Sequence, residues 1–178
     1  MKRNLIAILG SVLITMIGFV AVYAISDGQV LSNVNIKDAN DQPATIPDLG
    51  SKVLTIVYGD SDASDYSDPI SDALKAKNYD QKKQRGIGIA NLKDSPVFDS
   101  VIRMMVRSKI KKYQVTILTD PDLTLPKAWG LGNCNNKSVF IVIGKDKKVK
   151  YFRYFDKKNR PNQGDIDYVV KLVDGLVK

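Results

Sequence analysis

The sequence predicts one α/β domain in which helices cover both faces of a central sheet, giving three layers. Apolar β-branched runs alternate with segments of helical spacing, as expected where crossovers join parallel strands. Two late segments rich in β-branched and aromatic residues, 139–143 and 149–155, flank a Gly-Lys-Asp-Lys turn and should therefore form an antiparallel hairpin. The length of 178 residues suits a single domain with its own apolar core, and the chain contains no internal repeat.

The first part of the predicted domain is a hairpin, a buried strand and a short helix. Residues 34–37 alternate apolar and polar side chains, and 43–46 can return beside them after a polar turn, so we expect an N-terminal β-hairpin. The run 53–58 is uncharged and consists mainly of β-branched and aromatic residues, which is typical of a strand that is buried on both faces. A helix should follow with Asp68 as its N-cap and Pro69 at its first helical position.

The second part continues the alternation of strands and helices. Residues 86–92 and 115–118 are expected strands, and Ser95-Pro96 should open the helix between them, which extends to about Lys112. Short helical structure is expected near 123–129, and a final helix should end the chain. The helix before Lys112 has apolar residues at helical spacing, namely Val97, Phe98, Val101, Ile102, Met105 and Val106.

The start of the chain has the order of a secretory signal peptide. Lys2 and Arg3 form a basic head, residues 5–22 form an uncharged apolar run, and Val22 and Ala24 place small residues at the −3 and −1 positions of a cleavage site. We therefore predict that the protein is exported.

Two fates of this segment fit the pattern. Cleavage of a signal peptide at 1–24 would leave a single domain at 25–178. If the segment is not cleaved, residues 4–25 are long enough to anchor the protein in a membrane, and they would be its only membrane contact. No Cys directly follows the apolar run, so we expect no lipid-modified N-terminus. Both fates place the domain outside the cytoplasm.

The composition excludes several kinds of chemistry. The chain has no His, all of its 19 acidic residues are Asp, and its one Cys is Cys134. Ser-His-Asp and Cys-His nucleophiles, histidine metal sites, intrachain disulfides and C-x-x-C dithiols are therefore excluded. We expect no cofactor.

The net charge of +8 is concentrated near the end of the chain. Residues 145–160 hold eight basic side chains against Asp146 and Asp156. Aromatic residues between these charges are compatible with nucleic-acid binding, but export argues against it, and inward-facing strand residues explain them as well. We interpret the segment as a surface for an acidic envelope protein or another anionic envelope component. The basic residues are Lys145, Lys147, Lys148, Lys150, Arg153, Lys157, Lys158 and Arg160.

Two further groups are candidate sites. Cys134 is the one strongly nucleophilic side chain, so it is the candidate for a single-cysteine peroxidase, a redox sensor or an intermolecular disulfide. It has no His to activate it, and a reactive thiol needs an electropositive setting that the sequence does not reveal. Asp60, Asp62, Asp65 and Asp68 offer oxygen ligands for Ca²⁺ or Mg²⁺, although their spacing does not match the twelve-residue calcium loop. Clustered carboxylates of this kind are more commonly solvated.

Several stretches resemble the YtfJ family of bacterial periplasmic proteins, which is thioredoxin-like. The resemblance covers about residues 30–177 and implies a thioredoxin-like fold with an additional N-terminal β-hairpin, in the periplasm of a Gram-negative-type bacterium. The protein would be soluble there or tethered by its N-terminus. The stretches are K-V-L-T-I-V-Y, D-A-L-K-A-K-N-Y-D-Q-K-K-Q, I-G-I-A-N-L-K-D-S-P, R-S-K-I-K-K-Y, K-A-W-G-L and S-V-F-I-V-I-G-K-D-K-K-V.

The resemblance also implies where a reactive dithiol would lie. Thioredoxin-fold oxidoreductases place their reactive Cys after the first core strand, at the start of the next helix, which by position corresponds here to Asp62 through Asp65. A cis-proline normally precedes the facing hairpin strand, at a place near Lys137, but no proline lies between Leu131 and Phe140. Carboxylates cannot exchange disulfides. We therefore expect a protein that binds a partner without catalysis, with a Cys134 redox protein and an acidic-loop metal protein as the alternatives.

Overall fold

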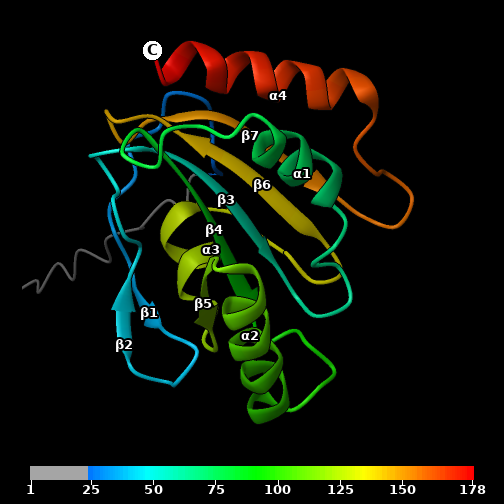
Figure 1. Cartoon of the computed structure of the whole chain (residues 1–178). Helices are drawn as coiled ribbons and strands as arrows, with labels where there is room; N and C mark the ends of the chain where they lie inside the picture. The colour runs from blue at the N-terminus through cyan, green and yellow to red at the C-terminus, as the bar shows by residue number, and fades with distance from the viewer. Residues whose placement is uncertain (1–23) are drawn as a thin grey trace, which may run out of the picture.

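The computed structural model describes residues 24–178, so the predicted signal peptide or anchor at 1–24 lies, apart from Ala24, outside the described residues. Seven strands form one sheet in the order β2-β1-β5-β4-β3-β6-β7 (Figure 1). The strands are β1 (Asn35–Lys37), β2 (Pro43–Thr45), β3 (Val53–Gly59), β4 (Gln84–Asn91), β5 (Thr116–Asp120), β6 (Ser138–Ile143) and β7 (Val149–Phe155). The helices are α1 (Asp68–Ala76), α2 (Asp99–Tyr113), α3 (Thr124–Trp129) and α4 (Gln163–Leu176).

Parallel pairing is confined to the centre of the sheet. Strands β3, β4 and β5 are parallel, whereas β6 runs antiparallel to β3, and β7 runs antiparallel to β6. The N-terminal hairpin of β1 and β2 joins the opposite side through one antiparallel pair, Lys37 with Thr119. The predicted parallel centre, terminal hairpin and N-terminal hairpin are therefore all confirmed.

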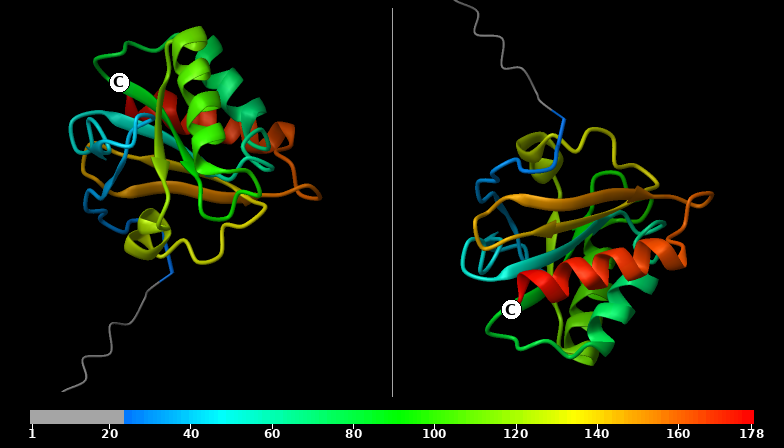
Figure 2. Two further views of the ribbon diagram at one scale, coloured as in Figure 1. Left: turned by 90° about the horizontal axis from the view of Figure 1, so that it is seen from below. Right: turned by 90° about the horizontal axis from the view of Figure 1, so that it is seen from above.

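Helices cover both faces of the sheet, as predicted (Figure 2). Helices α1, α2 and α4 lie on one face, because successive right-handed crossovers from β3 to β4 to β5 keep α1 and α2 on the same side. Helix α3 and the segment that precedes β1 cover the other face. The core under α3 includes Ile56 and Trp129, and the core under α1 and α4 includes Phe140 and Val169.

The hairpin of β1 and β2 is fixed to α2 by a nearly buried arginine. Arg103 donates through Nη1 to Thr119 Oγ1 at 2.7 Å and to the Asp38 carbonyl at 3.0 Å. Its Nη2 lies 2.7 Å from a carboxylate oxygen of Asp41 in the hairpin turn. Because this one guanidinium bonds to both β5 and the hairpin, it fixes the hairpin to the sheet. A two-stranded hairpin buries little surface of its own and is marginally stable without such contacts.

Two predicted helix starts are wrong. Helix α1 has Ser67, not Asp68, at its N-cap, and Pro69 is its second helical residue. Helix α2 begins at Asp99 rather than at Ser95-Pro96, with Phe98 at the N-cap. Ser95 is occupied in the loop, where its hydroxyl donates to the Asn91 carbonyl at 2.7 Å and accepts the backbone N–H of Ser61 at 3.1 Å. The hydroxyl of Ser95 therefore bonds within the loop, three residues before the N-cap of α2.

Candidate functional site

The candidate site lies where β3, β4 and β5 reach their carboxyl ends. Parallel strands end at the same edge of the sheet, and ligands of open α/β sheets bind outside that edge. The loop from Gly59 to Ser67 and the N-terminus of α1 lie there, as does the segment that enters β6 (Figure 1). This is also the edge at which the thioredoxin-like resemblance places reactive cysteines.

Two buried serines occupy the start of α1 and the start of β6. The hydroxyl oxygens of Ser67 and Ser138 are 2.6 Å apart, and both residues have no exposed surface. Ser138 directly follows Lys137, which lies near the place where the resemblance puts a cis-proline that this chain lacks, and no cis peptide bond occurs among residues 24–178. In the part of the chain that the structure describes, the hydrogen bond of each hydroxyl is to the other serine, and hydroxyl groups do not exchange disulfides.

The two segments approach each other closely beside this pair. A Cβ added to Gly59 would lie 3.1 Å from the Lys137 carbonyl oxygen, so a side chain at this position would need the neighbouring backbone to shift. The hydroxyl pair therefore sits in a tightly packed junction that leaves no room for a substrate thiol between Gly59 and Lys137.

Asp62 and Asp65 lie before α1 rather than at its N-terminus, where the resemblance had placed them. A series of turns separates β3 from α1, and both carboxylates are exposed on it. Asp65 lies 3.5 Å from Nη1 of Arg160, whose guanidinium lies 3.8 Å from the ring centroid of Tyr66. The sequence analysis missed this contact, since 95 residues separate Arg160 from Asp65.

Asp60 serves the backbone of the loop rather than a metal ion. One carboxylate oxygen accepts the N–H groups of Asp62 and Ala63 at 3.0 Å each, and the other accepts the Asn136 N–H at 2.6 Å. Burial raises the pKa of Asp60, and the three backbone hydrogen bonds oppose that rise. Within residues 24–178 no three acidic or cysteine side chains are grouped to hold a metal ion, so the structure does not assemble Asp60, Asp62 and Asp65 into a ligand set.

The Cys134 thiol is poorly placed for redox chemistry. The residue is 2 % exposed, and its S–H donates to the carbonyls of Leu131 and Gly132 at 3.9 and 3.7 Å. Burial raises the pKa of Cys134 to about 12, and the nearby Lys137 only partly opposes this. Reactive cysteines combine a lowered pKa with access to solvent, and this thiol has neither.

The basic segment is divided between the two ends of the β6–β7 hairpin. Lys145, Lys147 and Lys148 lie in the turn that joins the strands, whereas Lys157, Lys158 and Arg160 follow β7 at the other end. Between them Lys150 pairs with Asp146 at 2.7 Å, and Arg153 forms an ion pair with the buried Asp165. The eight cations predicted as one surface therefore do not form a single patch.

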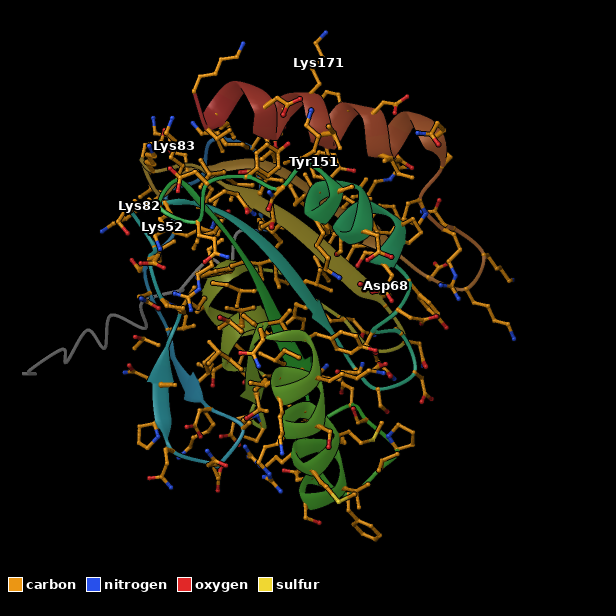
Figure 3. The ribbon with its side chains drawn as sticks, in the orientation of Figure 1. Lys52, Asp68, Lys82, Lys83, Tyr151 and Lys171 are labelled. Atoms are coloured by element: carbon orange, nitrogen blue, oxygen red, sulfur yellow. The ribbon has the colours of Figure 1, made fainter. Side chains whose placement is uncertain are left out.

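The aromatic residues of this segment pack against the protein. The ring centroid of Tyr151 is 5.6 Å from that of Tyr168 on α4, and Figure 3 shows Tyr151 beneath this helix. On the other face the Tyr154 hydroxyl donates to the Leu131 carbonyl at 2.9 Å. These contacts support the structural explanation of the aromatic residues rather than base stacking.

Known structures share this fold. The thioredoxin-like exposed lipoprotein Etrx1 of Streptococcus pneumoniae matches with a TM-score of 0.58 and 12 % identity, over 82 % of this chain and 100 % of its own. A peroxiredoxin-like protein of Aquifex aeolicus matches with a TM-score of 0.59 and 15 % identity, over 87 % and 90 %. A Chlorobium tepidum protein assigned as thiol:disulfide interchange protein DsbE matches with a TM-score of 0.59 and 10 % identity, over 87 % and 100 %.

The comparisons establish the fold of the chain. It has a thioredoxin-like fold of the α/β class, and its structural neighbours include proteins of thiol–disulfide exchange. No protein-family model and no curated protein matches the sequence. Within residues 24–178, no helix combines the length and the apolar character that a membrane span requires.

Proposed function

We propose that this chain is an exported thioredoxin-fold protein of the YtfJ family that acts by binding another macromolecule of the cell envelope, without thiol–disulfide exchange. One observation carries the proposal: the buried Ser67–Ser138 pair joins the start of α1 to the start of β6. Thiol–disulfide enzymes of this fold have their reactive Cys at that helix start, and serine hydroxyls do not replace it.

The properties of the single thiol support the same proposal. Cys134 is buried and its pKa is raised to about 12, so at neutral pH almost none of it is the nucleophilic thiolate. Because a fold does not determine function, the thioredoxin-like core is compatible with a binding surface and does not by itself imply thiol catalysis.

Export to the periplasm rests on the first residues and on two structural neighbours. Lys2, Arg3 and the apolar run 5–22 have the order of a signal peptide or an anchor. The Etrx1 neighbour is named as an exposed lipoprotein, and the other is assigned as DsbE. The positive net charge favours an acidic envelope protein or another anionic envelope component as the partner.

Cross-linking of the full chain in intact cells tests this function. We expect one stoichiometric adduct that resists dithiothreitol and is retained in the Cys134→Ala variant, because binding does not depend on the thiol. An adduct that disappears in either condition would establish a disulfide-linked, redox function instead. Absence of any adduct above background, at both low and high salt, would contradict the proposal.

A further inference from the structure

Helix α2 exposes apolar side chains that the described residues leave uncovered. Phe98 is 85 % exposed, Met104 54 %, Met105 48 % and Val101 37 %. The sequence pattern had grouped Phe98, Val101 and Met105 with the residues that pack inward, but among the apolar side chains of α2 only Ile102 and Val106 are buried. Clusters of exposed large apolar residues often mark interaction sites, whereas single exposed apolar residues are common on any protein surface.

The second half of the same helix is cationic. Arg107, Lys109, Lys111 and Lys112 are all exposed, and none of them forms an ion pair within residues 24–178. Arg107 instead donates to the Ala39 carbonyl at 2.8 Å. The exposed side of α2 therefore changes from apolar to positively charged along its length. Unpaired surface cations attract an anionic partner at long range.

An open hollow adjoins the apolar end of α2. It has a volume of about 640 Å³ and lies beside the carboxyl ends of β4 and β5. Phe98 lines the hollow and also belongs to the exposed apolar cluster, so the two features are continuous. Most of its lining is polar, and the polar residues include Lys93, Ser95, Asp99, Ser100 and Asp122.

We propose that this surface of α2 binds an acidic protein segment that carries bulky apolar side chains. The α2 surface consists of Phe98, Val101, Met104, Met105, Arg107, Lys109, Lys111 and Lys112. This inference rests on the proposed binding function and identifies where the partner docks. Aromatic and methionine side chains are enriched where protein interfaces exclude water. Acidic residues of the segment would lie along the four cations.

The hollow favours a protein segment over a bilayer. A bilayer presents a smooth interface, into which amphipathic helices insert their apolar face. The hollow beside Phe98 is lined by both polar and apolar residues. A peptide segment can place polar groups in it while its apolar side chains cover Phe98, whereas a smooth bilayer surface does not follow such a depression.

Titration of residues 24–178 with defined probes tests the inference. All described members of the three core clusters, from Ile25 to Val177, lie in this fragment, and a cooperative urea transition of the fragment is recorded first to establish that it folds. The probes are a peptide of Asp, Leu and Phe, its counterpart with Lys in place of every Asp, and phosphatidylglycerol vesicles. We expect the acidic peptide alone to bind and to shift the amide resonances of α2 and of residues 92–98.

Matched variants identify which residues of the α2 surface contribute to binding of the peptide. Phe98→Ala combined with Met104→Ala should weaken the acidic peptide by about tenfold or more, as loss of an apolar anchor does at interfaces. Lys111→Ala with Lys112→Ala, which removes two of the four cations, should reduce the salt dependence by about half. The controls are Tyr168→Ala, an aromatic residue on α4 that is 56 % exposed, and Lys157→Ala with Lys158→Ala; both should leave the affinity unchanged.

Three results would overturn the inference: equal binding of the two peptides, equal losses in the control variants, or binding of the vesicles in place of the acidic peptide. The outcome is separable from that of the proposed function. If the cellular adduct is retained in the α2 variants, the partner docks elsewhere while the binding function stands. If no adduct exists at all, the binding function itself is wrong.

Discussion

The hydroxyl groups of Ser67 and Ser138 are 2.6 Å apart although 71 residues separate them in the chain. Each is buried completely, so each depends on the other for a hydrogen bond inside the protein. The contact joins the N-cap of α1 to the first residue of β6. In this chain the same junction holds two backbone segments together.

A double-mutant cycle should measure this contact. We expect Ser67→Ala and Ser138→Ala each to lower the free energy of unfolding by about 1–3 kcal/mol, because each leaves the other hydroxyl buried without a partner. The double variant should cost less than the sum of the single ones, and urea unfolding monitored by circular dichroism gives all three values. Additive costs would show that the two hydroxyls contribute independently. Ser100→Ala, at an exposed position on α2, provides the control.

The sequence predicted the parts of the fold that local pattern determines. The segments 53–58, 139–143 and 149–155 are all in strands, because their β-branched and aromatic side chains pack on one or both faces of the sheet. It did not predict the path from Gly59 to Ser67, since the contacts that fix this loop are distant. The partner that Asp60 finds in Asn136 is 76 residues away.

Helical spacing also predicted the existence of α2 but not its burial. Apolar periodicity identifies the side of a helix that can pack, whereas the available partner surface decides how much of it does. The buried members of the cluster beneath α2 are Ala39, Leu92, Ile102 and Val106. Ile102 and Val106 pack within this small cluster, whereas Phe98 and Met105 remain exposed to solvent. The apolar residues of α2 that stay exposed form part of the α2 surface, which the sequence analysis did not predict.

Cys134 should be almost inert toward thiol reagents. With a pKa near 12 against an ordinary value of 9.0, its thiolate fraction at pH 8 falls by about a thousandfold, and burial slows access further. We expect iodoacetamide labelling in the native protein to be at least about a hundredfold slower than in the same protein unfolded in urea. Labelling at the unfolded rate would restore the redox hypothesis for this residue.

The same raised pKa predicts how stability depends on pH. Above pH 9 the unfolded chain loses the thiol proton while the folded protein retains it up to about pH 12. The unfolded state then binds fewer protons, so the contribution of Cys134 to stability is complete below pH 9 and is lost as the pH rises toward 12. Between pH 9 and 10 wild type should lose up to about 1.4 kcal/mol more than Cys134→Ala. An equal loss of the free energy of unfolding in the two proteins between pH 9 and 10 would contradict this prediction.

Calcium should not stabilise the acidic loop specifically. Both carboxylate oxygens of Asp60 already accept backbone N–H groups, and Asp65 lies beside Arg160. Thermal melts of residues 24–178 should therefore show the same Tm in Ca²⁺ and in NaCl of equal ionic strength. The Asp62→Asn with Asp65→Asn variant should respond identically. A Ca²⁺-dependent rise of several degrees that this variant abolishes would instead support the metal hypothesis.

Loss of Arg103 should release the N-terminal hairpin before the rest of the domain. Its guanidinium bonds to Thr119, to the Asp38 carbonyl and to Asp41, whereas Arg107 has a single bond to the Ala39 carbonyl. We expect Arg103→Ala to cost about 2–3 kcal/mol, since it removes hydrogen bonds of a charged group and leaves a buried gap. Arg107→Ala, the matched control, should cost less than about 1 kcal/mol because its partner stays near solvent. Amide hydrogen exchange should show faster opening of residues 35–45 in Arg103→Ala, while β3, β4 and β6 keep their protection. Equal effects of the two variants would mean that burial of the hairpin, rather than the Arg103 contacts, holds it against β5.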